Sequence, residues 1–421
     1  MDSGALGAGS FAAGDLAAHE RVELAGHIID SLILAKVLDL ILAAGADYLD
    51  LEVQVGRSSR DLSRATFTVA ARDEAALAGL LEELHVHGVN RAELGDVELA
   101  PAPADGILPA GFYSTTNLAT SVHAAGHWVE VGNPEMDCAL VVDKGRARTL
   151  PMHRVRAGQP VAVGHRGIRV LAPTPPRGNA SFEFMNSDVS SEKPKALLVA
   201  EVACQLAATK RAGGRLLFVC GPAVIHTGAG PDLERLVRGG FVDLLFAGNG
   251  FATHDIESNV LGTSLGYSLG GGFATEGGHA NHLRVINEVR RAGSIAAAVE
   301  SGYLSSGVMA TCVELGIPFV LAGSLRDDGP LPDVLRDVVA AADAMREQIA
   351  GVGAAVMLAS TLHAIATGNI LPASVLTYCV DINHAVVTKL ADRGSHQALG
   401  IVTDVGLFLR DLADELVPTA R

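Results

Sequence analysis

The sequence predicts an α/β fold whose C-terminal half is a Rossmann-like, doubly wound parallel sheet. From residue 186 onward, short apolar runs alternate regularly with longer segments of helical period. The composition agrees: 49% hydrophobic residues, only 4% aromatic residues and 47 glycines suit elements that pack closely on small side chains. The patterns before residue 186 predict a small α+β domain followed by a small all-β domain.

The first 185 residues divide into three parts. Residues 1–20 are expected to form a flexible tail. Residues 21–92 form the predicted α+β domain, with a helix over 31–44 stopped by Gly45, strands in DLEVQVG and ATFTVAA, and a helix in DEAALAGLLEEL. Residues 93–185 form the β-rich domain, because short alternating runs (HWVEV, CALVV, GIRVLA) recur between Gly and Pro residues. The turn-rich stretch PTPPRGN leads out of it.

Residues 186–421 form the predicted Rossmann-like domain. Its first helix, LVAEVACQLAATKRAGG, ends at Gly213. Continuous apolar strands are typical of parallel sheets buried on both faces. We expect six of them, at 215–220, 241–247, 317–322, 354–359, 375–380 and 399–403. Helices are expected near 231–238, 305–315, 333–349, 362–368 and 385–392.

Charge and cysteine usage exclude several classes of protein. A net charge of −15 argues against nucleic acid and against anionic membrane surfaces as partners. We find no apolar run long enough to span a bilayer, and the N-terminus lacks the basic region of a signal peptide. The five cysteines are scattered without a CxxC pair, which favours reduced thiols and a cytoplasmic location.

Polar and glycine-rich segments follow every predicted strand of the sheet. In an open α/β sheet, ligands bind beyond the carboxyl ends of the strands. The sequence therefore predicts one ligand crevice made of these segments: Gly221-Pro222, 248–250, 324–328, 360–363, 381–383 and 404–406.

One pair of strand ends predicts a dinucleotide. Ser360 opens a helix after one strand, and Asp381 ends the next strand 21 residues later. Dinucleotide folds place the pyrophosphate at a helix N-terminus and an acid on the ribose about 20 residues onward. The acid favours NAD over NADP. The full G-x-G-x-x-G fingerprint is absent, so a turn cap remains the alternative for Asp381.

Titratable side chains gather at the same predicted edge, where they suit proton transfer: His226, His254, Asp255, Glu257, Arg326, Asp327, Asp328 and His363. The overlapping G-x-S-x-G matches at 262–270 lack the leading strand of a hydrolase elbow. His279 and His282 lack the further ligands of a zinc site, so we expect no metal.

The sequence also resembles the archaeal-type ornithine cyclodeaminases, which carry an N-terminal domain named for lysine-oxoglutarate reductase/saccharopine dehydrogenase. The resemblance runs from about residue 26 to the C-terminus through GHIIDSLILAKVLD, GFYSTTN, GPAVIHTGAG, FAGNGFATHDIE, LAGSLRDDGPLPDV, TLHAIATGNILPA and CVDINHAVVTKLADRGS. It implies conversion of L-ornithine to L-proline and ammonia with bound, recycled NAD. It implies NAD contacts at Asn249, Gly250, Asp328, Ser360, Thr361, Leu362, His363, Asp381, Asp404 and Val405. A homo-oligomer is expected by analogy.

The residues leave the catalytic roles and the substrate open. Our hypotheses are proton transfer by Asp255 or His254, an ammonium contact from Asp328 or Glu257, and a carboxylate contact from Arg326. The chain departs from the family's pattern at Gly250-Phe251 and at Asn281, near the expected site. A dehydrogenase or cyclodeaminase for another basic amino acid is therefore one alternative. A non-enzymatic NAD-binding regulator is another.

Overall fold

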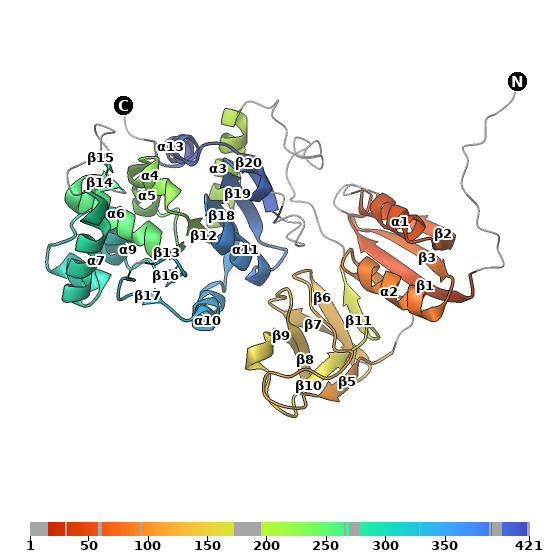
Figure 1. The fold of residues 1–421 in the computed structure, drawn as a ribbon. Coiled ribbons are helices and arrows are strands. Elements are labelled where there is room, and N and C mark those ends of the chain that lie inside the picture. The colour runs from red at the N-terminus through yellow and green to blue at the C-terminus, as the bar shows by residue number, and fades with distance from the viewer. Residues whose placement is uncertain are drawn as a thin grey trace, which may run out of the picture. The chain divides into compact units, whose positions relative to one another are not determined.

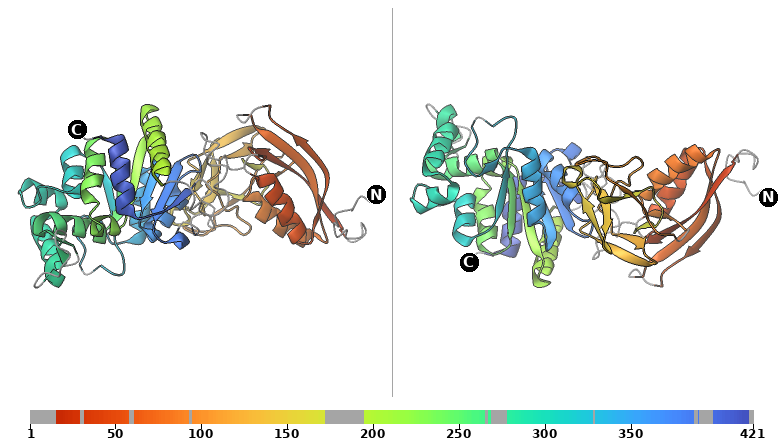
Figure 2. Two further views of the ribbon diagram at one scale, coloured as in Figure 1. Left: turned by 90° about the horizontal axis from the view of Figure 1, so that it is seen from above. Right: turned by 90° about the horizontal axis from the view of Figure 1, so that it is seen from below.

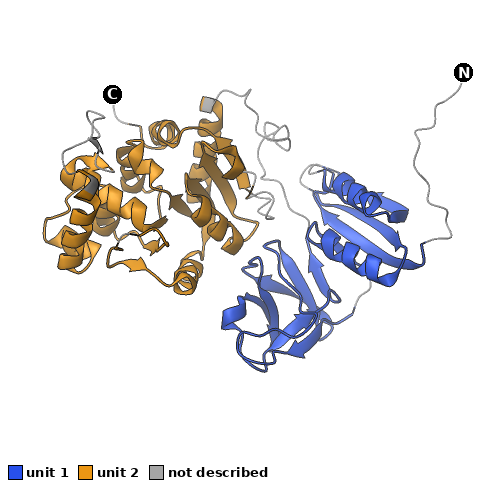
Figure 3. Cartoon of the chain, in the orientation of Figure 1, with its two compact units in different colours: residues 1–183 blue, residues 184–421 orange. Residues whose placement is uncertain are grey.

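The computed structural model describes residues 16–29, 32–57, 61–92, 95–171, 195–264, 267–268, 278–327, 329–386, 389 and 398–418. Figure 1 and Figure 2 show its helices and strands. The chain divides into two compact units, residues 1–183 and 184–421, which Figure 3 distinguishes by colour. The predicted linker PTPPRGN and predicted site residue Asp328 lie outside the described residues.

Unit 1 begins with a four-stranded antiparallel sheet in the order β2-β3-β1-β4. The strands are β1 (Ala18–Gly26), β2 (Asp47–Gln54), β3 (Ser63–Ala71) and β4 (Val89–Arg91), and the helices are α1 (Ile33–Ala43) and α2 (Glu74–His85). Both helices cover one face, where Val22, Phe67 and Ile41 are fully buried (Figure 1). β1 starts at Ala18, inside the predicted tail, because its backbone pairs with β3 up to Ala71.

The second part of unit 1 is a seven-stranded sheet in the order β11-β6-β7-β9-β8-β10-β5. The elements are β5 (Glu98–Pro101), β6 (Thr120–Ala124), β7 (His127–Gly132), β8 (Ala139–Asp143), β9 (Arg146–Leu150), a 3-10 turn η1 (Met152–Arg154), β10 (Pro160–Val163) and β11 (Ile168–Val170). Asn90 joins the two sheets, since its side-chain amide donates to the Val170 carbonyl at 2.7 Å and its oxygen accepts from the Val170 N–H at 2.6 Å.

Unit 2 contains the predicted parallel sheet, which confirms the fold class. Its strand order is β17-β16-β13-β12-β18-β19-β20, and every described pair of neighbours is parallel. The strands are β12 (Arg215–Cys220), β13 (Leu244–Gly248), β16 (Phe319–Ala322), β17 (Val334–Leu335), β18 (Val352–Leu358), β19 (Leu376–Asp381) and β20 (Ala398–Val402). A separate short hairpin pairs β14 (Thr263–Ser264) with β15 (Tyr267–Ser268).

Helices bury both faces of this sheet (Figure 1, Figure 2). Phe218 and Val356 pack on the side of α3 and α13, whereas Val219 and Met357 pack on the side of α10 and α11. The helices are α3 (Lys195–Arg211), α4 (Ala223–His226), α5 (Gly230–Arg238), α6 (Asn249–Leu261), η3 (Gly278–Ala280, a 3-10 turn), α7 (Asn281–Ala292), α8 (Ile295–Glu300), α9 (Val308–Leu315), α10 (Val338–Gln348), α11 (Thr361–Ile370) and α13 (Val405–Leu416).

The structure corrects two predicted boundaries. The expected helix over 333–349 begins at Val338 because Asp337 caps it, accepting the N–H groups of Val339 and Ala340, and β17 precedes it. The expected strand over 241–247 is Leu244–Gly248, since Gly239 and Gly240 close helix α5 just before it. None of the described helices is long and apolar enough to cross a membrane.

Candidate active site

The carboxyl ends of the central strands meet at one edge of the unit 2 sheet. The register aligns Cys220 with Ala247 on one side and with Leu358 on the other. Strand order reverses at β12, because β13, β16 and β17 follow one another to one side while β18, β19 and β20 follow to the other. This switch point between β12 and β18 is where open α/β sheets form a ligand crevice.

Two backbones approach closely at the switch point. A Cβ on Gly221 would overlap the carbonyl oxygen of Ala359, so only glycine fits there. Ala359 itself has φ 47°, a left-handed conformation that a residue with a Cβ rarely adopts. Strained backbone of this kind is concentrated at functional sites. It turns the chain sharply from β18 into α11.

Helix α11 presents its N-terminus at this edge. Ser360 is its N-cap residue, and the Ser360 hydroxyl lies 3.2 Å from Nδ1 of His363. A Cβ on Gly248 would lie 3.0 Å from Cε1 of His363, so the His363 ring rests against the end of β13. Burial lowers the pKa of His363 below its ordinary value, which favours a neutral ring. Leu362 is 79% exposed, an unusual position for leucine.

Asp381, the predicted ribose-binding acid, and Asp404, which follows β20, both make capping hydrogen bonds. Oδ1 of Asp381 accepts the N–H of Asn383 at 2.8 Å, and the residue is nearly buried. Asp404 caps α13 by accepting the N–H of Leu407 at 2.9 Å, and Val405 is the buried first residue of that helix. These caps fix both carboxylates at the crevice edge. In both residues the contact is made through Oδ1.

Asn249 is a structural link as well as a predicted cofactor contact. Its side-chain oxygen accepts the N–H of Leu331 at 3.0 Å and so holds the loop that follows β16. Asp327 in this loop accepts the N–H and the hydroxyl of Ser324. Arg326 is exposed there. The loop therefore borders the edge from the side of β16.

His254, which is partly buried, and Glu257 form an acid–base pair on α6. Nδ1 of His254 lies 2.9 Å from Oε2 of Glu257, and Glu257 is fully buried. Because a carboxylate only accepts, Nδ1 carries the hydrogen of this contact, and Nε2 is the ring nitrogen that does not face Glu257. This is the arrangement in which an acid orients a histidine base for proton transfer.

A chain of further polar residues hydrogen-bonds to the Glu257 carboxylate. The Thr263 hydroxyl donates to Oε1 of Glu257 at 2.8 Å and accepts from the Asn281 amide at 2.9 Å. Arg284 donates to the Asn281 oxygen at 2.8 Å. Asn281, one of the departures from the family's pattern, thus belongs to this network. Sequence reasoning did not identify Thr263, since no local pattern links it to a helix that ends before it.

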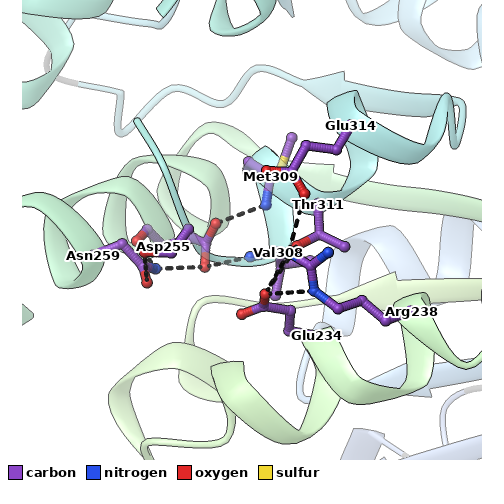
Figure 4. Close-up of polar contacts among 9 residues, drawn as sticks. Glu234, Arg238, Asp255, Asn259, Val308, Met309, Thr311 and Glu314 are labelled. Carbon is purple, nitrogen blue, oxygen red and sulfur yellow. Dashed lines mark hydrogen bonds and ion pairs between the residues drawn. The ribbon is translucent and has the colours of Figure 1, made fainter. Parts of the chain in front are cut away.

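Asp255 points away from this pair and holds helix α9. Its carboxylate accepts the backbone N–H groups of Val308 and Met309 at 3.1 and 2.8 Å, as Figure 4 shows. The side chain is fully buried, and a Cβ on Gly307 would lie 3.0 Å from it. Asp255 therefore stabilises the start of α9. The geometry does not support the hypothesis that it transfers protons to a substrate.

The pKa of Asp255 leads to a testable prediction. Burial outweighs the two N–H donors and raises the pKa to about 7. The folded protein then binds this proton more tightly than the unfolded chain, so stability falls as pH rises from about 4 to about 7 and levels off above it. Relative to Asp255→Asn, the wild-type free energy of unfolding should fall by about 2–4 kcal/mol across this window, measured by urea denaturation. If the difference in free energy of unfolding between the wild type and Asp255→Asn did not change with pH, the raised pKa of Asp255 would be contradicted.

Phe251 is a core residue, not a site residue. It is fully buried in the main hydrophobic cluster of unit 2. Gly250 has room for a side chain, because a Cβ there would lie 3.8 Å from Pro222. The expectation that Gly250-Phe251 marks a difference in the substrate site therefore finds no support at Phe251. Among the described residues, no cluster of three His, Cys, Asp or Glu side chains is placed to hold a metal ion.

Comparison with known families covers nearly the whole chain. Residues 19–118 match the family described as the LOR/SDH bifunctional enzyme conserved region. Residues 119–199 match the first C-terminal region of the arginine dihydrolase ArgZ-like family, and residues 200–412 match its C-terminal Rossmann-fold region.

Several relatives and solved structures are similar over long stretches. Ornithine cyclodeaminase of Methanocaldococcus jannaschii is 53% identical, covering 94% of this chain and 96% of the relative. The bifunctional arginine dihydrolase/ornithine cyclodeaminase AgrE of Nostoc is 42% identical, and the match covers 58% of its length.

Among solved structures, a conserved LOR/SDH protein from Methanococcus maripaludis has a TM-score of 0.73 at 47% identity, covering 77% of this chain and 98% of that one. A ternary complex of AgrE with ornithine and NAD⁺ has a TM-score of 0.52 at 41% identity, covering 95% and 57%. With an N-terminal LOR/SDH region, a Rossmann-fold region and an ornithine cyclodeaminase that is 53% identical over 96% of its own length, the chain belongs to the ornithine cyclodeaminase family.

Proposed function

We propose that this protein is an NAD-dependent ornithine cyclodeaminase that converts L-ornithine to L-proline and ammonia. One observation carries the proposal: the hydrogen-bonded pair of His254 and Glu257 lies on α6, the helix that starts at the carboxyl end of β13. The family and the AgrE complex with ornithine and NAD⁺ support the substrate and the cofactor. A non-enzymatic NAD-binding regulator would need the ligand crevice but not the His254–Glu257 pair.

The crevice residues fit NAD. Gly221 lets the backbone after β12 approach that of Ala359, just before α11, and α11 directs its free backbone N–H groups toward the same edge. Asp381 would hold the adenosine ribose, while Ser360, Thr361, Leu362, His363, Asp404 and Val405 would line the rest. Asn249 and Gly250 would contact the cofactor from α6. Bound NAD would supply a hydride acceptor for Cα of the substrate and later return the hydride.

His254 would act as the general base. Its Nε2 would take a proton from the α-ammonium group, because a neutral amine is needed before the Cα–H bond can break. Glu257 would stabilise the imidazolium that results and would keep the ring in the productive tautomer. Holding both nitrogens of one diamine in the site would favour ring closure by proximity. Arg326, exposed on the loop that follows β16, would bind the substrate carboxylate, and Asp328, two residues later in the sequence, would contact an ammonium group.

Asp381 should set the preference for NAD. A hydrogen bond to a charged group contributes about 1.5–3 kcal/mol, so Asp381→Ala should weaken NAD binding by about 10- to 100-fold. NADP binding should change much less, because the acid repels the 2′-phosphate in the wild type. Isothermal titration of both cofactors would measure this. Equal losses for the two cofactors would show that Asp381 acts only as a turn cap.

A substrate panel tests the function itself. Purified protein with NAD should release ammonia from L-ornithine and yield proline, detected by mass spectrometry. L-lysine and 2,4-diaminobutyrate would test the neighbouring chain lengths, which a site shaped for five-membered ring closure should disfavour. No ammonia from ornithine would reject the proposal. Tight NAD binding without turnover on any diamine would indicate the regulator.

A further inference from the structure

A second histidine lies against the catalytic pair. His226 is the last residue of α4, and its ring centroid is 4.7 Å from that of His254, with an angle of 61° between the planes. Nδ1 of His226 lies 2.7 Å from the hydroxyl of Ser264, which is buried on β14. Each ring is therefore held through Nδ1 by its own partner. In each ring, Nε2 is the nitrogen that these two contacts do not use.

We infer that His226 is a second catalytic residue, which carries a proton from the nitrogen that closes the ring to the nitrogen that leaves. The inference rests on the proposed cyclodeaminase function and assigns one imidazole to each half of the reaction. His254 would serve the oxidation at Cα, and His226 would serve the exchange of one amine for the other.

The exchange step needs a shuttle of this kind. The neutral δ-amine attacks the carbon of the α-iminium ion, forming a C–N bond, and the new ring nitrogen becomes positively charged. His226 takes one proton from that nitrogen and gives it to the α-nitrogen. The bond between Cα and the α-nitrogen then breaks, ammonia leaves, and a cyclic iminium ion remains. The imidazole is neutral before and after, and no oxidant or reductant is consumed.

The surroundings of His226 suit a shuttle more than a primary base. Its hydrogen-bond partner is a hydroxyl, whereas His254 has the carboxylate of Glu257. Burial and the neighbouring His254 lower the pKa of His226, while the more distant Glu257 raises it less. An imidazolium of low pKa gives up its proton readily, which helps an amine to leave. Two imidazoles this close also disfavour two simultaneous charges.

The test separates the two halves of the reaction. In a single turnover with ornithine, His226→Asn protein should still develop absorbance at 340 nm, but the signal should persist and ammonia release should fall by about 100-fold or more. Ser264→Ala, which removes a positioning contact, should show the same pattern with a smaller loss. His127→Asn, at an exposed histidine of unit 1, should match the wild type.

Three results would decide against the shuttle. They are normal ammonia release by His226→Asn, equal loss of the 340 nm signal and of ammonia, or a Ser264→Ala variant whose 340 nm kinetics alone are impaired. If wild-type protein gives neither signal, the proposed function fails instead, and the two failures are thereby distinguished. Unchanged NAD affinity of each variant would confirm that the crevice is folded.

A titration without substrate gives an independent readout. Histidine-labelled protein followed by NMR should show His226 titrating below its ordinary pKa, and the value should rise in His254→Asn protein, since the neighbouring charge is removed. A His226 pKa that does not respond to His254→Asn would show that the rings are not coupled and would overturn the two-base arrangement.

Discussion

Replacement of Glu257 by glutamine should lower kcat for ornithine by about 10²- to 10⁴-fold. The glutamine amide can donate to Nδ1 of His254, which would move the ring hydrogen to Nε2 and remove the base. The Thr263 hydroxyl can still donate to the remaining oxygen, so the fold should be preserved. Steady-state ammonia release and the melting temperature would be measured together.

The matched control for this variant is Glu300→Gln, which changes an exposed glutamate at the end of α8. It should behave as the wild type. A Glu257→Gln enzyme whose kcat stays within tenfold of the wild type, while the control is normal, would show that the pair does not drive proton transfer.

Gly221→Ala should lower the free energy of unfolding of unit 2 by about 3 kcal/mol or more. The new methyl group would overlap the Ala359 carbonyl oxygen, and backbone on both strands would have to move. The melting temperature should fall by about 6–12 °C for a domain of this size. NAD affinity should fall as well, because the displaced Ala359 backbone leads directly into the N-terminus of α11.

Gly250→Ala is the control for Gly221→Ala. Its Cβ would meet Pro222 only at ordinary contact distance, and the residue lies inside helix α6. Alanine there should leave stability unchanged or raise it by about 0.5–1 kcal/mol. Thermal unfolding that is equally impaired by both variants would contradict the close approach at the switch point.

The sequence predicted the sheet well because its strands are buried on both faces. The run LLFVC in β12 is fully buried and apolar throughout, so it is visible without any knowledge of the fold. The spacing of Ser360 and Asp381 was visible for a similar reason, since one crossover helix separates neighbouring strands. The sequence did not predict β17, because a strand of two residues is too short to show a hydrophobic pattern.

The separate roles of His254, Asp255 and Glu257 in the stretch FAGNGFATHDIE follow from its helical conformation. Residues 249–261 form α6 from the first residue after β13, so His254 and Glu257 share one face at a spacing of three. Asp255, two residues before Glu257, points to another face and meets α9. The sequence alone does not distinguish His254, Asp255 and Glu257, because the strand-end pattern does not show which way each side chain points. The contribution of Thr263 and Asn281 depends on how α7 packs against α6, which no local pattern encodes.

In the proposed reaction, hydride would leave Cα, stay with the bound cofactor and return to the same carbon while the α-nitrogen is lost. Ornithine labelled with deuterium at Cα and ¹⁵N at the α-nitrogen, turned over in ordinary water, measures this in one experiment by mass spectrometry. We expect proline that retains deuterium at Cα, carries no ¹⁵N, and is accompanied by ¹⁵N-ammonia. Proline that has lost the deuterium to solvent, or that keeps the ¹⁵N, would contradict it.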